Sequence, residues 1–282
     1  MLYRPARKSS FYFCLSFFIL FVLFLYGPML AIMTLSFQGP TGGLTFPMNG
    51  ISLHWFSELF RDQRVGDFKG SFTRSLSLAT VVMVLTVIIS LSAGMAFRKK
   101  FWSANLLFYL TISSLIIPSI LLTLGIGLLF DRLDIEAQWY TAGIGAHLTW
   151  TLPFGLLIMF AIFNRFNKSY EEAGRDLGAN DWQILKFILL PIIGPSLVGV
   201  GLFGFTLSFD EFARSLLSIG SKNTLPLEIF GMTTTVTTPT LYALGTLTTL
   251  VSFTIIGLCF GIIVWLEKRR KRFGDDSGKG LI

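Results

Sequence analysis

The chain has 282 residues, of which 52% are hydrophobic and 14% are charged. A soluble globular domain carries about 25% charged residues, so this chain has too few charges to cover a water-exposed surface, and it is far too apolar to be disordered. We therefore expect a membrane protein. The net charge of +7 would suit nucleic-acid binding only if the basic residues formed a patch on a folded surface.

Six apolar stretches are long enough to cross a bilayer. A helix needs about 20 apolar residues to span about 30 Å of hydrocarbon, and only helices and closed barrels satisfy their backbone polar groups there. None of the stretches shows the alternating pattern of a membrane barrel. We predict an all-α membrane protein with six transmembrane helices, over residues 11–37, 72–97, 105–130, 142–163, 187–209 and 242–266.

The first stretch could be mistaken for a signal peptide, because basic residues precede its apolar part. That part is about twice as long as a typical signal-peptide core, and no small-residue cleavage site precedes Gln38. We therefore expect residues 11–37 to be retained as the first transmembrane helix.

The positions of lysine and arginine predict the orientation. Sixteen of them lie in the segments on the side of the N-terminus and six in the opposite segments, with Arg214 not counted. Positively charged loops resist translocation, so we expect cytoplasmic ends at residues 1–10 and 267–282 and an external loop at residues 38–70. The basic run at residues 268–272 is then the normal flank of the last helix, and we expect no nucleic-acid binding.

The cytoplasmic segment at residues 165–186 is longer than a simple connector needs, and its sequence predicts two short helices separated by a turn. Ser169 followed by Glu172 is a capping-box pattern that predicts a short helix, and Gly178 permits a turn after it. Asn180 can cap a second short helix. That helix would pack against the bundle through Trp182, Ile184 and Leu185, and the pair of helices would form a polar projection that exposes Glu171, Glu172, Arg175 and Asp176.

The same segment carries a motif. Glu172-Ala173-Gly174 is followed after three residues by Gly178 and after nine more by Ile188-Leu189-Leu190-Pro191. This resembles the E-A-A-x3-G-x9-I-x-L-P signature of binding-protein-dependent ABC importer permeases, with Gly174 as the one departure. Glycine in place of alanine should loosen a helix by up to about 1 kcal/mol. The resemblance covers residues 71–266 and implies the type I importer fold, preceded by the helix at residues 11–37.

The resemblance implies a role for the motif and a set of partners. In this family the segment is a coupling helix that inserts into a groove on an ATPase subunit. The implied coupling residues are Glu171, Glu172, Ala173, Gly174, Asp176 and Gly178, with Pro191 where the segment joins the fifth helix. The implied partners are two ATPase subunits, a second homologous permease and a periplasmic substrate-binding protein, around a multi-pass protein of the bacterial inner membrane.

ATP hydrolysis is then expected in the ATPase partner, so we expect this chain to be no enzyme and to hold no cofactor or metal. His54 and His147 are too few and too far apart for a catalytic set, and Cys14 and Cys259 lack metal-ligand or redox spacing. Gly199-x-Gly201-x-x-Gly204 imitates a dinucleotide fingerprint, but it lies within an apolar helix with no strand before it, which favours helix packing.

Two further segments bear on the solute. Residues 205–212, FTLSFDEF, and residues 225–230, LPLEIF, resemble F-T-L-S-x-D-[DE] and L-P-L-x-I-[YF] in the second permease subunit of spermidine/putrescine importers. The resemblance implies a polyamine as the solute. Similar strings occur in importers of other small organic solutes and of iron, which stay open as alternatives.

Membrane energetics favours Asp210 as a solute contact. A carboxylate in a membrane helix costs roughly 2.5 to 3.5 kcal/mol, so it normally faces a cavity or a partner. Asp210 and Glu211 point about 100° apart on a helix, so we expect one of them, Asp210, to face the path beside Phe209. The equally weighted alternative is a structural ion pair between Asp210 and Arg214.

Aromatic residues offer a second contact with an alkylammonium chain. Trp150, Tyr140 and Trp139 could enclose such a chain through cation–π interactions, or they could anchor helix ends at the membrane interface. We place Trp150 in the predicted solute path.

Two other classes of protein remain as alternatives. An ion-gradient secondary transporter often carries a pairwise repeat, which this sequence does not show. A membrane-embedded enzyme needs convergent His, Asp or Glu side chains, which the sequence lacks. Co-purification with an ATPase subunit separates both from an ABC permease.

Overall fold

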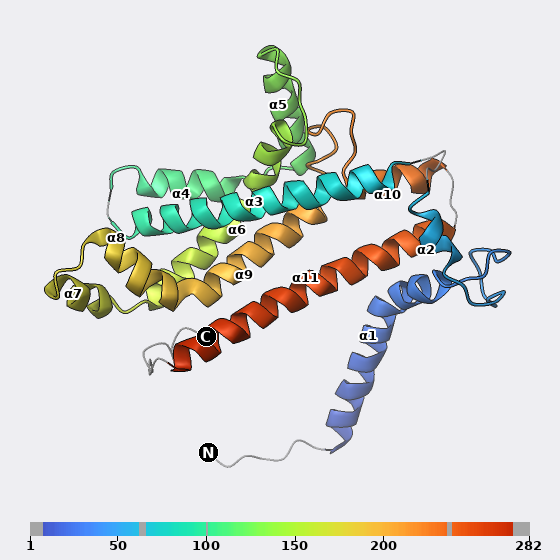
Figure 1. Ribbon diagram of the computed structural model, residues 1–282, viewed down its shortest axis with the longest axis horizontal. Helices are drawn as coiled ribbons and strands as arrows, with labels where there is room; N and C mark the ends of the chain where they lie inside the picture. The colour runs from blue at the N-terminus through green and yellow to red at the C-terminus, as the bar shows by residue number, and fades with distance from the viewer. Residues whose placement is uncertain (1–7, 62–65, 100, 236–238, 273–282) are drawn as a thin grey trace. The chain divides into compact units, whose positions relative to one another are not determined.

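The computed structural model describes residues 8–61, 66–99, 101–235 and 239–272 (Figure 1). The protein is all-α, as predicted. Five helical segments of the described residues are long and apolar enough to cross a membrane: Ser10–Leu35, Phe68–Phe97, Ala142–Arg165, Asp181–Phe209 and Pro239–Lys268. Of the expected cytoplasmic ends, residues 1–7 and 273–282 lie outside the described part.

Five of the six predicted stretches correspond to long helices. They are α1 (Lys8–Leu35), α3 (Phe68–Phe97), α6 (Ala142–Arg165), α9 (Leu190–Phe209) and α11 (Pro239–Arg272). Asp67 begins α3, because its carboxylate accepts a 2.8 Å hydrogen bond from the backbone N–H of Gly70. That bond is the main reason why the pKa of Asp67 lies below its ordinary value.

The third predicted stretch is not one helix. It forms α4 (Ala104–Ser113) and α5 (Ser119–Arg132), and the prediction of a single helix over residues 105–130 is wrong. Pro118 lies directly before α5, with backbone angles outside the helical region. A proline has no backbone N–H to continue a helix and disfavours helical backbone in the residue before it, so the helix ends ahead of Pro118.

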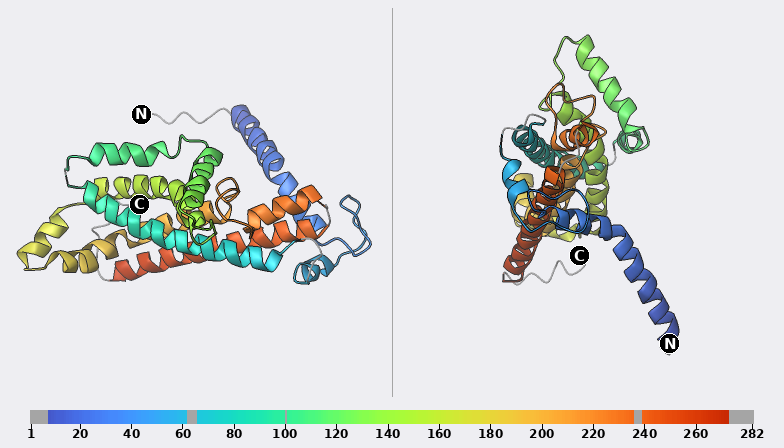
Figure 2. Two further views of the ribbon diagram at one scale, coloured as in Figure 1. Left: turned by 90° about the horizontal axis from the view of Figure 1, so that it is seen from above. Right: turned by 90° about the vertical axis from the view of Figure 1, so that its right-hand side faces the viewer.

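The described residues divide into two compact units. One comprises residues 67–231 and 252–272. At its centre lie α3, α6 and α9, and each of these three helices packs against the other two (Figure 1, Figure 2). Close approach depends on small residues. A Cβ at Gly94 of α3 would lie 2.9 Å from Cβ of Met159 in α6, and one at Gly204 of α9 would lie 3.2 Å from Cβ of Thr86 in α3.

Polar contacts and small residues hold these helices together. The hydroxyls of Thr86 and Thr151 share a buried 2.7 Å hydrogen bond between α3 and α6. A Cβ at Gly201 would lie 3.4 Å from Cγ2 of Val87 and 3.5 Å from Cγ of Met83, both in α3, which is ordinary van der Waals contact. Gly201 and Gly204 therefore serve helix packing, as predicted and as is typical of interfaces between membrane helices. The prediction does not hold for Gly199, where a Cβ would have no described neighbour within 4 Å.

At one end of this three-helix bundle lie α7 (Ser169–Asp176) and α8 (Asp181–Ile184), which continue through a π-helical turn, η1 (Leu185–Leu189), into α9 (Figure 2). A buried cluster joins the last turns of α6 to η1 and the start of α9. It contains Met159, Ile162, Phe163, Phe166, Leu189, Ile192 and Ile193. This cluster fixes where the connecting segment leaves and re-enters the bundle. The short helix α10 (Leu225–Thr235) follows α9 in the chain.

The other unit comprises the described residues up to Gly66 and residues 232–235 and 239–251. After α1 the chain turns around the buried side chain of Gln38. Its amide donates a 3.0 Å hydrogen bond to the carbonyl of Gly43 and its Oε1 accepts a 2.8 Å bond from the backbone N–H of Asn49. The short helix α2 (His54–Glu58) follows, with Phe56 packed against Phe37.

Candidate functional site

The turn between α7 and α8 has the predicted glycine but not the predicted cap. Gly178 has a φ of +81°, a left-handed conformation that a side chain would strain. The expected capping box of Ser169 and Glu172 is wrong. The residue at the N-cap position is Lys168, and its side chain makes no capping hydrogen bond. Instead the backbone N–H of Ser169 donates a 3.0 Å hydrogen bond to Oδ1 of Asn167.

The second short helix begins where the sequence predicts. Asn180 and Gln183 form a reciprocal capping box: Oδ1 of Asn180 accepts from the backbone N–H of Gln183 at 2.9 Å, and Oε1 of Gln183 accepts from that of Asn180 at 2.8 Å. Ile184 is buried, but Trp182 is 66% exposed. The expectation that Trp182 packs against the bundle is therefore wrong, because the short helix turns it outward.

Glu171 faces the bundle rather than the surface. Its side chain accepts a 2.6 Å bond from Nη1 of Arg98, at the end of α3, and the residue is only 9% exposed. The guanidinium carbon of Arg98 also lies 5.1 Å from the ring centre of Phe163 and 5.5 Å from that of Phe166. The predicted exposure of Glu171 is wrong, because Arg98 draws it inward and so connects α3, α6 and α7.

The outward face of α7 and its turn is formed by Glu172, Ala173, Asp176, Leu177 and Gly178, all of them exposed. Leu177 is 89% exposed, although it is apolar. Gly174 lies on the opposite, buried face, where a Cβ would lie 2.6 Å from Cδ1 of Ile188. The glycine at the departure from the motif therefore allows α7 to lie close to η1.

Pro191 is the second residue of α9, which begins directly after the π-helical turn. Proline has no backbone N–H, so no α-helical hydrogen bond can form from residue 191 to the carbonyl of Phe187. A wider turn at residues 185–189 follows from this missing bond.

The predicted solute-path residues lie near the far end of α9. Glu211 does not stand free: its Oε1 accepts a 2.9 Å bond from the backbone N–H of Arg214, and its Oε2 lies 3.7 Å from Nη1 of the same residue. Arg214 is buried, and its guanidinium carbon lies 4.5 Å from the ring centre of Trp150. Trp150 therefore already has a cation over its ring.

Asp210 has a different environment. The expected alternative, an ion pair between Asp210 and Arg214, is wrong because Glu211 takes that position. Among the residues that the structure describes, the carboxylate of Asp210 has no hydrogen-bond or ion-pair partner. Asp210 is exposed and lines a cavity of about 150 Å³ with Phe205, Thr206, Phe209, Ser252, Ile255 and Ile256. Phe209 stacks on Phe205 at 5.5 Å between ring centres.

A buried polar network beside Arg214 was not foreseen from the sequence. Nδ1 of His147 lies 2.8 Å from the hydroxyl of Ser208, and its Nε2 lies 3.0 Å from that of Ser215. Nε of Arg214 donates to the hydroxyl of Thr149 at 3.3 Å. A polar residue within an apolar helix is the only sequence signal for such a network, and it does not reveal the partners.

Comparison with known proteins shows which family the chain resembles in sequence. Residues 86–272 match the family model described as binding-protein-dependent transport system inner membrane component. The chain is 30% identical to the spermidine/putrescine transport system permease protein PotC of Haemophilus influenzae, over 83% of this chain and 90% of that protein. It is 29% identical to the putrescine transport system permease protein PotI of Escherichia coli K12, over 88% and 90%.

Solved structures support the fold. A chain of a bacterial ABC transporter involved in the import of the acidic polysaccharide alginate superposes with a TM-score of 0.71 at 14% identity, over 90% of this chain and 94% of that one. A chain of the MetNI methionine ABC transporter superposes with a TM-score of 0.54 at 20% identity, over 70% and 94%. The chain thus belongs to the family of binding-protein-dependent transport system inner membrane components and is a permease subunit of an ABC importer.

Proposed function

We propose that this permease imports a polyamine, such as spermidine or putrescine. The observation that carries the proposal is the carboxylate of Asp210, which has no partner within the described residues and lines a cavity beside the stacked rings of Phe205 and Phe209. A carboxylate balances the charge of an ammonium group, and aromatic faces bind the alkyl chain and its cations. The names of the relatives agree with this solute.

The transport path would form between this chain and a second, homologous permease. The proposed assembly lies in the bacterial inner membrane. In this chain α4 and α5 together would make a sixth span beside the five long helices, with both termini in the cytoplasm. A periplasmic binding protein would deliver the solute, and two ATPase subunits would supply the energy. The solute cavity at Asp210 would then be completed by the partner permease.

In this assembly α7 would dock on the ATPase through Glu172, Ala173, Asp176 and Gly178. ATP binding would close the ATPase pair, move the docked helices together and open the path to the outside, and hydrolysis would reset it. The contact must differ between the open and closed ATPase, because a contact of equal strength in both states shifts no equilibrium. Glu171 would pass the displacement of α7 to α3 through Arg98.

The proposed solute is tested with Asp210→Asn in proteoliposomes that hold the complete importer. Loss of the carboxylate should reduce spermidine uptake by about tenfold or more. Basal ATP hydrolysis should not change, because Asp210 follows the last residue of α9 whereas α7 precedes its first. Glu211→Gln is the matched control, since Glu211 bonds to Arg214 and should affect folding more than solute choice.

Competition assays separate the alternatives. Unlabelled putrescine should block uptake of labelled spermidine, whereas neutral organic solutes and ferric iron should not. Undiminished uptake by Asp210→Asn, or block by a neutral solute or by iron, would reject the polyamine proposal in favour of those solutes.

A further inference from the structure

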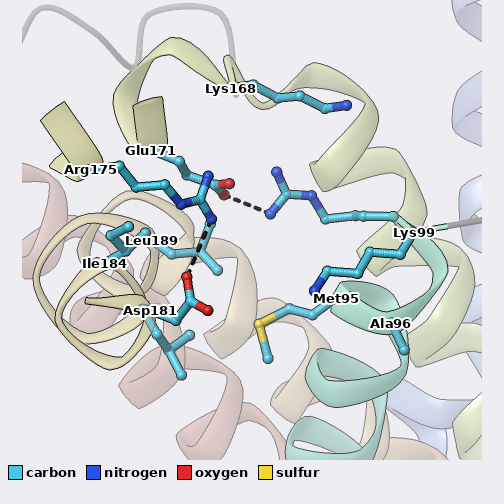
Figure 3. Close-up of a pocket in the computed structure, with 11 residues that line it drawn as sticks. Met95, Ala96, Lys99, Lys168, Glu171, Arg175, Asp181, Ile184 and Leu189 are labelled. Carbon is cyan, nitrogen blue, oxygen red and sulfur yellow. Dashed lines mark hydrogen bonds and ion pairs between the residues drawn. The ribbon is translucent and has the colours of Figure 1, made fainter. Parts of the chain in front are cut away.

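A cleft of about 450 Å³ lies between the last turn of α3 and the segment formed by α7, α8 and η1 (Figure 3). Figure 3 shows Met95 and Lys99 on one side of this cleft and Arg175 and Asp181 on the other. Its full lining is Met95, Ala96, Arg98, Lys99, Lys168, Glu171, Arg175, Asp181, Ile184, Leu185 and Leu189. The solute path proposed above uses none of these residues.

The charges in this cleft do not balance. It has four basic side chains and two carboxylates, and each carboxylate is already paired: Glu171 with Arg98 at 2.6 Å, and Asp181 with Arg175 at 3.3 Å. Lys99 and Lys168 are exposed, and their ammonium groups make no hydrogen bond or ion pair with any described residue. Two ammonium groups thus remain in one cleft with no counter-charge from the described part of the chain.

The rest of the lining is apolar. Met95 and Ala96 belong to α3, a helix long enough to cross the membrane, and Ile184, Leu185 and Leu189 form the opposite wall. The cleft therefore combines a cationic rim with an apolar wall at the end of a membrane helix. The proposed orientation places this end of the bundle in the cytoplasm, and basic pockets between helices at that surface of a membrane bind the head groups of anionic lipids.

We propose that this cleft binds the phosphate of an anionic phospholipid, with Lys99 and Lys168 as the two charged contacts. Hydrogen bonds from an ammonium group to phosphate are charge-assisted and stronger than neutral ones. Free phosphate offers the same anionic group, but only a lipid also uses the apolar wall. A bound lipid would bridge the end of α3 and the start of α7, the two elements that Arg98 and Glu171 join.

The test uses the assembled importer in detergent, titrated with phosphatidylglycerol while native mass spectrometry counts the bound lipid. Each lysine near an anionic membrane surface contributes about 5-fold in affinity, so Lys99→Gln with Lys168→Gln should weaken binding about 30-fold. The matched control is Lys186→Gln, because Lys186 is exposed on η1 but outside the cleft. Phosphatidylcholine should bind equally weakly to all variants.

Two results would overturn the proposal. Equal affinity of the double variant and the Lys186→Gln control would remove the two lysines as contacts, and release of the lipid by millimolar inorganic phosphate would assign the cleft to free phosphate. These substitutions change exposed side chains, so the folded protein should persist, and thermal unfolding checks this. The experiment needs neither ATP nor solute, so its outcome is independent of the proposed polyamine transport.

Discussion

Arg98 connects three helices through one side chain. It follows α3, stacks beside two phenylalanine rings at the end of α6 and pairs with Glu171 of α7. The side chains of Arg98 and Glu171 are mostly shielded from water, so neither charge can be solvated well if the other is removed. A shielded ion pair of this kind adds little to the net free energy of folding, but it fixes the relative positions of the helices that it joins.

Replacing Glu171→Met should therefore lower the free energy of unfolding by about 2 to 3 kcal/mol, because it leaves the guanidinium of Arg98 without its counter-charge. Replacing both residues with Met should recover most of this loss, since no unpaired charge remains. Thermal unfolding of the detergent-purified protein measures both effects.

The exposed pair of Arg175 and Asp181 provides the control for this experiment. Arg175→Met should change the unfolding free energy by no more than about 0.5 kcal/mol, because exposed ion pairs contribute little. A double Met variant that is less stable than the single Glu171→Met variant would show that the pair is not what stabilises this corner.

Local chemistry made some residues predictable. Gly178 in a left-handed turn and Asn180 at a helix start depend only on their immediate neighbours. The burial of Glu171 depends on Arg98, 73 positions earlier, and the pairing of Glu211 with Arg214 depends on how the chain turns after α9. No local pattern specifies such contacts, so their assignments from sequence were wrong or incomplete.

Hydrophobic runs predicted which segments form helices better than they predicted whether each helix is continuous. Long apolar stretches identify α1, α3, α6, α9 and α11 because a helix satisfies its own backbone in lipid. Hydropathy alone predicted one helix over residues 105–130. An average over this stretch counts Pro118 only as one more residue and ignores the hydrogen bond that a proline cannot make. A break of this kind changes backbone geometry without changing hydropathy.

The element that should matter most for coupling is α7 with its turn. In proteoliposomes of the full importer, Gly178→Pro should abolish uptake while ATP hydrolysis persists. Proline cannot adopt the positive φ of this position, so it would misplace the face that we propose as the docking surface. Glu172→Ala should reduce the uptake per ATP hydrolysed in the same direction, through loss of one exposed contact.

Asp181→Ala is the control for these variants, since its side chain is exposed at the start of α8 rather than on the outward face of α7. It should leave the ratio of uptake to ATP hydrolysis near that of the unchanged protein. Normal uptake by the Gly178→Pro variant would argue strongly against α7 as the docking element.

For the molecule as a whole, the sequence predicted the all-α class and the family, because a motif with many fixed spacings is specific even where packing is unknown. It did not predict the contacts around the proposed solute path, because these join residues far apart in the chain, such as Trp150 and Arg214. The similarity to the polyamine permeases covers 83% to 88% of this chain, so it is not confined to the motif.

The central claim is that α7 and its turn face the cytoplasm and contact an ATPase. Leu177 is the best reporter, because it is apolar and almost fully exposed at the tip of this segment. The measurement is cross-linking from Leu177→Cys in native membranes, in a background where Cys14 and Cys259 are replaced by Ser, with Ile135→Cys in the segment after α5 as the control.

The account predicts that Leu177→Cys cross-links to the ATPase subunit, with a yield that changes when ATP is added, and is protected from a membrane-impermeant maleimide applied outside. Ile135→Cys should react with that maleimide and give no cross-link. Labelling of Leu177→Cys from the outside, or no cross-link to the ATPase in the assembled importer, would contradict the account.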